Sequence, residues 1–231
     1  MLDNHNLDIL QQYEYIAAQC AELILWLGWL RSSEAFSLRI QDVELTPPQD
    51  HGKYNLPTGI GVILLRLLPS TKTNRDKQAD MVIAWETSGG LKLGYWLTKL
   101  ITIMQSLSWC SPDSYLFRSK NNTPWTSYYF RTQHLYPYLL QQLHNKDPFL
   151  RHLPLTKEVR IEQLFYSLHS YRRGAQSHCL RKRPGCIRAA YPHEKIEHGR
   201  WRVKNKGVED MPTHYTEASV EDRIYLTLLC F

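Results

Sequence analysis

The residues of this chain best suited to chemistry lie in the segment HSYRRGA, from His169 to Ala175. The segment places an imidazole, His169, and a guanidinium, Arg172, three residues apart, and on a helix such a pair faces the same way. Transfer of a phosphoryl group without a metal ion needs several cationic donors gathered around the phosphate. The pair supplies part of such a cluster, so its partners have to come from elsewhere in the chain.

Further stretches carry residue types that suit the same chemistry. Arg31 lies in GWLRSSEAF with Glu34 three residues after it, and Lys72 lies in the polar stretch STKTNR. Trp201 ends the motif HGRW, and Tyr215 lies in PTHYTEAS near the end of the chain. Each has an ordinary structural alternative: an arginine paired with Glu34, a solvated lysine, or a packed aromatic ring. The order of these stretches along the chain, more than any single residue, favours the chemical interpretation.

This order resembles that of the tyrosine recombinase (phage integrase) family: an arginine that begins a short helix, a lysine in a β-hairpin, HxxR and a late tyrosine. The motif HGRW is especially similar to that of recombinases from mobile elements. The resemblance covers nearly the whole chain and implies that residues 1–231 form one catalytic domain. Its fold would be α+β, mostly helical with a small antiparallel β-sheet or hairpin. The chain begins about one helix before Arg31, so we expect the separate N-terminal domain that clamps DNA to be absent.

The resemblance implies that the protein cuts and rejoins DNA strands. Tyr215 would attack a scissile phosphate, forming a 3'-phosphotyrosyl bond and freeing a 5'-hydroxyl, with no metal ion and no cofactor. A tyrosine hydroxyl has a pKa of about 10, so positive charge must stabilise the developing phenolate and phosphate oxygens. Arg31 and Arg172 would supply that charge through planar forks that stay protonated. Lys72 would donate a proton to the departing 5'-oxygen.

The remaining candidates would assist this step. His169 would hydrogen-bond a non-bridging phosphate oxygen or help to move the proton of Tyr215, and Glu34 would orient Arg31. Trp201 would contact the phosphate through its indole N–H and brace the segment of the tyrosine. Because the phosphotyrosyl bond conserves energy, a 5'-hydroxyl of another strand can reverse the step, which gives strand exchange without ATP.

The charge of the chain suits a polyanionic partner. The net charge is +6 and the isoelectric point is near 9.0, and clustered Lys and Arg side chains bind phosphate groups. We expect double-stranded DNA as the partner, bound by a homotetramer on paired recombination sites as the resemblance implies. The expected DNA-binding residues are Arg39, Lys72, Arg173, Arg181, Lys182, Arg183 and Arg200.

Several alternatives stay open. Tyr215 lies 14 residues beyond Trp201, an interval longer than the family pattern leads us to expect, so Tyr225 is the alternative nucleophile, although the surrounding IYLTLLCF is apolar enough to be packing. The same interval keeps open a catalytically impaired DNA-binding remnant of a mobile-element recombinase. A type IB topoisomerase-like enzyme shares the chemistry but acts as a monomer, and HGRW favours the recombinase.

The cysteine and histidine pattern gives little support to a metal site. The five cysteines are scattered and odd in number, which is typical of a reducing, intracellular compartment. A possible zinc cluster has spacings that match no common zinc finger, so we expect no metal. Its members would be Cys179, Cys186, His193 and His198. No secretory signal is visible, and we expect an intracellular, DNA-associated protein, nuclear in a eukaryote and cytoplasmic in a prokaryote or virus.

Hydrophobic periodicity predicts the elements that must position these residues. We expect a helix over about 7–30, a short helix capped by Ser32 or Ser33 that ends near Arg39, and a loop over 46–59. The runs GVILLRLL and MVIAW predict a β-hairpin whose long basic connection carries Lys72. Helices are expected over 91–107 and 127–143, the second kinked at Pro137, and the remainder is expected to be helical with irregular basic connections.

Overall fold

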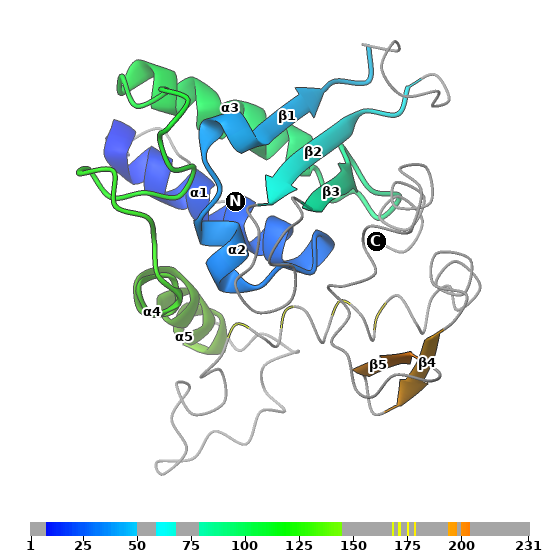
Figure 1. Ribbon diagram of the computed structural model, residues 1–231. Helices are drawn as coiled ribbons and strands as arrows, with labels where there is room; N and C mark the ends of the chain where they lie inside the picture. The colour runs from blue at the N-terminus through cyan, green and yellow to red at the C-terminus, as the bar shows by residue number, and fades with distance from the viewer. Residues whose placement is uncertain are drawn as a thin grey trace.

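The computed structural model of the chain describes residues 8–49, 59–67, 79–144, 168, 171, 175, 178, 194–197 and 200–203. These residues form an arrangement of α+β class, as expected (Figure 1). In chain order the elements are α1 (Ile9–Leu27), α2 (Ser32–Phe36), the 3-10 turn η2 (Ile40–Asp42), β1 (Val43–Thr46), β2 (Val62–Leu67), β3 (Ala79–Ala84), α3 (Leu93–Ser106), α4 (Ser127–Phe130), the π-helix η3 (Arg131–Leu135), α5 (Tyr136–His144), β4 (Glu194–Glu197) and β5 (Arg200–Val203).

Helix α1 begins at a capping box and forms the centre of the core. The Asp8 side chain accepts a hydrogen bond from the backbone N–H of Gln11 at 2.8 Å, and the Gln11 side chain accepts one from the Asp8 N–H at 3.1 Å. These two bonds satisfy N–H groups that the first turn of a helix leaves without partners. Apolar residues at helical spacing then bury one side of α1, so its predicted extent is confirmed to within a few residues.

The three strands β1, β2 and β3 form an antiparallel sheet in that order. Strands β2 and β3 confirm the predicted hairpin, with Leu67 paired to Ala79 where the strands leave the sheet. Strand β1 was not predicted, because four residues of intermediate burial are too short to show a period of two. Helix α3 packs on α1, and the N–H of Gly94 in α3 donates to the carbonyl of Trp85, just after β3, at 2.9 Å. Helices α4 and α5 lie on the far side of α1 and α2 from the sheet (Figure 1).

Alternate side chains of the sheet join the helices in one core. Strand β2 directs Ile63 and Leu65 toward the core, and β3 directs Met81 and Ile83 toward it. They pack with buried residues of α1 and α3, whose predicted extent over 91–107 is confirmed apart from its first and last residues. Burial of this apolar surface is the dominant stabilising term of the fold.

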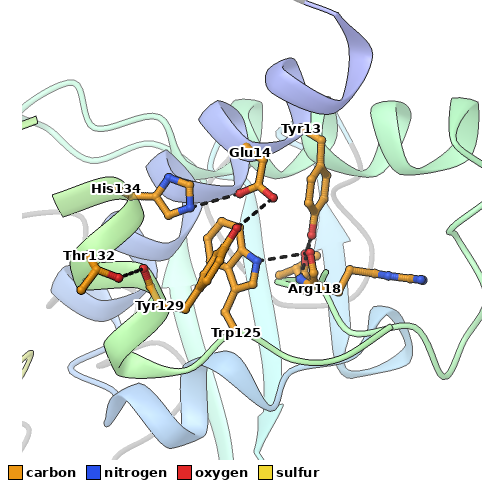
Figure 2. Close-up of polar contacts among 8 residues, drawn as sticks. Tyr13, Glu14, Arg118, Trp125, Tyr129, Thr132 and His134 are labelled. Carbon is orange, nitrogen blue, oxygen red and sulfur yellow. Dashed lines mark hydrogen bonds and ion pairs between the residues drawn. The ribbon is translucent and has the colours of Figure 1, made fainter. Parts of the chain in front are cut away.

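The side chain of Tyr13 ties α1 to the segment that follows α3 (Figure 2). Its hydroxyl accepts a hydrogen bond from the backbone N–H of Arg118 at 2.8 Å and donates one to the carbonyl of Leu116 at 3.1 Å. Its ring meets the Trp109 ring edge-on, with centroids 5.2 Å apart. Burial raises the pKa of the Tyr13 hydroxyl far above its ordinary value. The hydroxyl therefore stays protonated and serves as both donor and acceptor in the core.

Next to Tyr13, Glu14 ties α1 to α4 and η3 (Figure 2). One carboxylate oxygen accepts a hydrogen bond from the Tyr129 hydroxyl at 3.3 Å, and the other lies 3.1 Å from Nε2 of His134. The His134 ring also stacks on Trp125, with centroids 4.7 Å apart. These contacts hold the helical region after residue 126 against α1.

The helical region 127–144 departs from α geometry, as the proline predicts, but does so before Pro137. A π-helical turn, η3, precedes α5, and the N–H of Tyr136 donates to the carbonyl of Arg131, five residues earlier. Pro137 has no N–H, and its ring would clash with the carbonyl four residues before it in a regular helix. The wider turn relieves this crowding, so the helix bulges where a kink was expected.

Two sequence predictions are wrong in detail. The N-cap of α2 is Arg31, with neither Ser32 nor Ser33 in that position, and the Ser32 hydroxyl instead accepts a hydrogen bond from the Ser127 hydroxyl at 2.5 Å. Helix α2 ends at Phe36, well before Arg39, because the next residues turn to run beside the segment near Leu116: the Leu116 N–H donates to the Leu38 carbonyl at 2.8 Å.

The region after residue 144 was predicted to be helical, but residues 194–203 contain a β-hairpin. Strands β4 and β5 pair antiparallel, with Ile196 opposite Trp201 and Glu197 opposite Arg200. The two residues between the strands, His198 and Gly199, suit the short connections that β-hairpins favour. The motif HGRW therefore ends in a strand.

Replacing Tyr13 by phenylalanine is expected to lower the free energy of unfolding by about 1–3 kcal/mol, because it leaves a buried N–H and a buried carbonyl without their partner. Urea denaturation measures this change. The matched control is Tyr15→Phe on the same helix, where the ring is 36% exposed and the expected change is within about 0.5 kcal/mol. Equal losses in the two variants would contradict the role given to the Tyr13 hydroxyl.

Candidate functional site

The backbone after α1 turns sharply to place Arg31. Gly28 ends the helix, with its N–H bonded to the carbonyl of Ile24 at 2.9 Å, and Trp29 then takes a left-handed conformation with φ of 52°. That conformation is costly for an aromatic residue. Trp29 and Leu30 are each only 2% exposed, so their burial offsets the strain and fixes the direction in which the chain leaves α1.

Arg31 is held by Glu34 at two points. The backbone N–H of Arg31 donates to Oε2 of Glu34 at 2.7 Å, and a terminal guanidinium nitrogen lies 3.5 Å from Oε1. The side chains of Arg31 and Glu34 are 24% and 16% exposed. Glu34 thus fixes both the start of α2 and the direction of the guanidinium, a contact compatible with an ordinary helix cap and with a site arginine.

Four described residues in and near the sequence motif HxxR lie against the core. These residues, Leu168, Tyr171, Ala175 and His178, are spaced as on one face of a helix, and Leu168 and Ala175 are buried in the main core. The Tyr171 hydroxyl is hydrogen-bonded to Glu22 of α1.

One turn further along α1, the ring of Trp26 lies 6.1 Å from that of His178, centroid to centroid. Tyr171 and His178 therefore both contact the C-terminal half of α1. Arg31 lies five residues after Trp26, just beyond the end of this helix.

Glu22 is a carboxyl group in a largely apolar environment. Burial raises its pKa to about 7, and the hydrogen bond from Tyr171 partly opposes this rise because it favours the ionised form. Burial also raises the pKa of the Tyr171 hydroxyl, and the nearby Glu22 carboxylate adds to that rise. The sequence analysis did not select either residue, although an acid inside the apolar stretch 20–30 is the signal that could have drawn attention to Glu22.

Arg39, predicted to bind DNA, has partners within the chain. Its guanidinium lies 3.0 Å from the Asp113 carboxylate and 5.2 Å above the centre of the Tyr115 ring. Asp113 is largely exposed, so a phosphate could exchange with it at the surface. The structure therefore places Arg39 in a partly exposed position, paired with Asp113.

The predicted residues Arg200 and Trp201 lie on β5, where the structure describes the backbone. Lys72 belongs to the connection 68–78 between β2 and β3, outside the described residues. The same holds for the other predicted catalytic, DNA-binding and metal-site residues. These are His169, Arg172, Arg173, Arg181, Lys182, Arg183, Tyr215 and Tyr225, together with Cys179, Cys186, His193 and His198.

Basic residues are distributed unevenly along the chain. Residues 8–49, 59–67 and 79–144 carry eight Lys and Arg side chains against nine Asp and Glu side chains, although the whole chain has 28 against 22. The positive surplus therefore lies outside this packed framework, in segments that include the connection with Lys72 and the region with HxxR and RKR. A polyanion would be attracted mainly to these segments.

Within the described ranges, no three His, Cys, Asp or Glu side chains gather as a metal site would require. Nor does any helix in that part of the chain have the length and apolar character needed to cross a membrane.

No model of a protein family matches the sequence, and no curated protein matches it.

Replacing Glu34 by alanine is expected to lower the free energy of unfolding by about 1 kcal/mol, because the Arg31 N–H loses its acceptor at the start of α2. The control is Glu34→Gln, whose amide oxygen can still accept that bond while the ion pair is lost, at a cost of about 0.5 kcal/mol or less. Chemical denaturation of both variants tests the order. A larger loss for glutamine than for alanine would contradict the capping role.

Glu22 should make stability depend on pH. Below pH 4.5 the carboxyl group is protonated in both the folded and the unfolded chain, so its contribution is fully present. Between pH 4.5 and 7 the unfolded chain loses the proton while the folded chain keeps it, and the free energy of unfolding falls by about 3 kcal/mol. Denaturation at a series of pH values measures this fall relative to Glu22→Gln, which has no proton to lose. Parallel curves for the two proteins would contradict the raised pKa.

Proposed function

We propose that this protein is a DNA strand transferase of the tyrosine recombinase type, which cuts and rejoins double-stranded DNA as a tetramer on paired sites. One observation carries the proposal: Tyr171 and His178, which lie on either side of Arg172 in the sequence, contact the same end of α1 that leads to Arg31. Near this end of α1, Glu22 contacts Tyr171 and Trp26 contacts His178. Arg31 follows Trp26 by five residues. Two stretches more than a hundred residues apart thus meet at one helix end.

The chemistry proposed for this place needs two cationic forks around one phosphate. Arg31 is already oriented by Glu34 and partly exposed, and Arg172 directly follows Tyr171, whose hydroxyl is bonded to Glu22. Two guanidinium groups stay charged at all relevant pH values and each can bind two phosphate oxygens. Such a pair would stabilise the charge that develops when Tyr215 attacks the phosphorus.

The β2–β3 hairpin supports the proposed role of Lys72. Strands β2 and β3 pair up to Leu67 and Ala79, so the connection 68–78 begins and ends where these two strands leave the sheet. This connection contains Lys72, Arg75 and Lys77, a composition suited to a DNA groove. In the proposed reaction Lys72 protonates the 5'-oxygen that leaves the phosphorus.

The charge distribution is the second line of support. The framework of residues 8–49, 59–67 and 79–144 has no positive surplus, while the segments proposed to bind DNA supply it. Phosphate contacts dominate the affinity of proteins for DNA, so the basic residues are concentrated where the proposal requires them. His169 and Trp201 complete the proposed phosphate site through hydrogen bonds to its oxygens.

The test is a covalent trapping experiment with a pool of nicked DNA duplexes of randomised sequence around the nick. In such a substrate the short 5'-hydroxyl strand diffuses away after cleavage, so the phosphotyrosyl adduct accumulates and is seen on a denaturing gel. We expect the wild-type protein to form the adduct without added metal, in the presence of EDTA. Tyr215→Phe should abolish the adduct and leave retention of DNA on a filter nearly unchanged, because only the attacking oxygen is lost.

Two controls make the outcome specific. Tyr225→Phe should form the adduct normally; an adduct lost in this variant but kept in Tyr215→Phe would move the nucleophile to Tyr225. Arg31→Ala should slow adduct formation by about 10²–10³-fold, while Arg66→Ala, which removes a partly exposed arginine paired with Glu44 on the sheet, should not. A wild-type protein that retains DNA but forms no adduct on the pool would leave the non-catalytic DNA-binding remnant as the function.

A further inference from the structure

A partly open cavity of about 460 Å³ lies where α3 packs on α1 (Figure 1). Its described walls come from these two helices and from Trp85, just after β3, and the aliphatic side chains among them are Ile16 and Ile103. A volume of this size is typical of sites that hold a small organic molecule. None of the described lining residues is a candidate for the chemistry at Arg31, so the proposed strand transfer leaves this cavity unexplained.

Three aromatic side chains from three parts of the chain line the cavity. Tyr15 of α1 and Tyr95 of α3 are 36% and 46% exposed. Trp85 is held against α3, because its carbonyl accepts a hydrogen bond from the N–H of Gly94 at 2.9 Å and a side chain at Gly94 would overlap its ring. Together these rings offer faces on which a planar aromatic ligand can stack.

Lys99 gives the cavity a positive charge. It is the one charged side chain among the described residues that line the cavity. Its Nζ lies 4.7 Å from the centre of the Tyr95 ring and 5.6 Å from that of the Trp96 ring, and such contacts hold an ammonium group over the rings. An ammonium group has three donors and no acceptor, so it suits an anionic group of a ligand, such as a phosphate.

Two threonine hydroxyls of α3 add acceptors to the same cavity. The Thr98 hydroxyl donates to the carbonyl of Gly94 at 2.8 Å, and the Thr102 hydroxyl donates to the carbonyl of Thr98 at 2.9 Å. Because each hydroxyl proton is already used, the two oxygens can only accept hydrogen bonds from a ligand. The exocyclic amino group of adenine is a donor of this kind.

We propose that this cavity binds a nucleotide, with the base stacked on the aromatic rings and the phosphate at Lys99. An apolar ligand would leave Lys99 unused, and an inorganic anion would leave the rings unused. A free mononucleotide and an unpaired nucleotide of single-stranded DNA offer the same chemistry. Binding here is independent of the proposed strand transfer, because none of these residues takes part in that reaction.

The test is calorimetric titration of the full chain with deoxyadenosine monophosphate, deoxyadenosine, ribose 5-phosphate and a short single-stranded oligodeoxyadenylate. The monophosphate should bind about 2–5-fold more tightly than deoxyadenosine, as expected for one exposed ion pair, and this preference should shrink at high salt. Ribose 5-phosphate should bind far more weakly, because it has no base to stack. Equal affinity for deoxyadenosine and its monophosphate would overturn the proposal.

Substitutions on both helices locate the ligand in the cavity. Tyr15→Ala and Tyr95→Ala should each weaken binding of the monophosphate at least about 5-fold, since loss of a stacked ring has effects of that size. The matched control is Tyr128→Ala, which removes a 70% exposed tyrosine of α4 and should leave the affinity unchanged. Urea midpoints should stay near that of wild type, because all three side chains are exposed. Unchanged affinity in both cavity variants would overturn the proposal.

A second pair of variants tests the charge. Lys99→Gln should bind the monophosphate and deoxyadenosine with equal affinity, because the ion pair to the phosphate is lost. The control is Lys92→Gln, which removes the lysine that pairs with Glu86 just before α3 and should keep the preference for phosphate. A preference that survives in Lys99→Gln would contradict the phosphate contact proposed for Lys99.

The oligonucleotide separates the two sources of the ligand. If unpaired DNA occupies the cavity, Tyr95→Ala weakens binding of the oligonucleotide and of the monophosphate by similar factors. If a free nucleotide occupies it, Tyr95→Ala weakens binding of the monophosphate alone, since the oligonucleotide is then held by basic segments elsewhere. Formation of the covalent adduct is a separate readout: nucleotide binding without any adduct would refute the strand transfer and leave this site in place.

Discussion

The described structure depends on the packing of a single helix, α1, with all its surroundings at once. Its apolar residues contact the sheet and α3, while three polar side chains each reach a segment from a different part of the sequence. Tyr13 bonds the backbone near Leu116, Glu14 bonds Tyr129 and contacts His134, and Glu22 bonds Tyr171. Apolar burial drives the assembly, but it is non-directional. The three polar contacts select one arrangement among those that would bury a similar area.

In this arrangement, residues that are far apart in the sequence meet at one end of α1. The end of α1, the strained turn at Trp29 and the short helix α2 place Arg31 beside Glu34. Tyr171 and His178, from much later in the sequence, contact the same helix. In the function we propose, contacts behind the phosphate site would bring its two halves together.

The sequence was sufficient to predict the elements with strong periodicity. The apolar pattern predicted α1, α3 and the β2–β3 hairpin, and the pair Arg31 and Glu34 was visible as an i,i+3 spacing. Strand β1 and the hairpin of β4 and β5 were not predicted, because a four-residue strand has too few alternating apolar and polar residues to be recognised. The end of α2 depends on a backbone bond from Leu116, far along the chain, which no local pattern contains.

The candidate site shows the same contrast between local patterns, which the sequence reveals, and contacts between distant residues, which it does not. The contact between Glu22 and Tyr171 joins residues that are far apart in sequence, so periodicity gives each a place on a helix face but cannot pair them. The sequence predicted a kink at Pro137, and the structure has a π-helical turn just before this residue. The position of the distortion was therefore predicted to within one turn, but its kind was not. The roles of Lys72, His169, Arg172 and Tyr215 stay predictions from the order of motifs.

The near balance of opposite charges in the framework has a consequence for how such a protein can change. Net repulsion contributes little to the stability of a nearly neutral body, so added salt would act on its folding only weakly. Substitutions that add or remove cations outside residues 8–49, 59–67 and 79–144 would therefore change the attraction of the chain to polyanions with little effect on this framework. The attraction of the chain to polyanions and the stability of its fold could then change independently of each other.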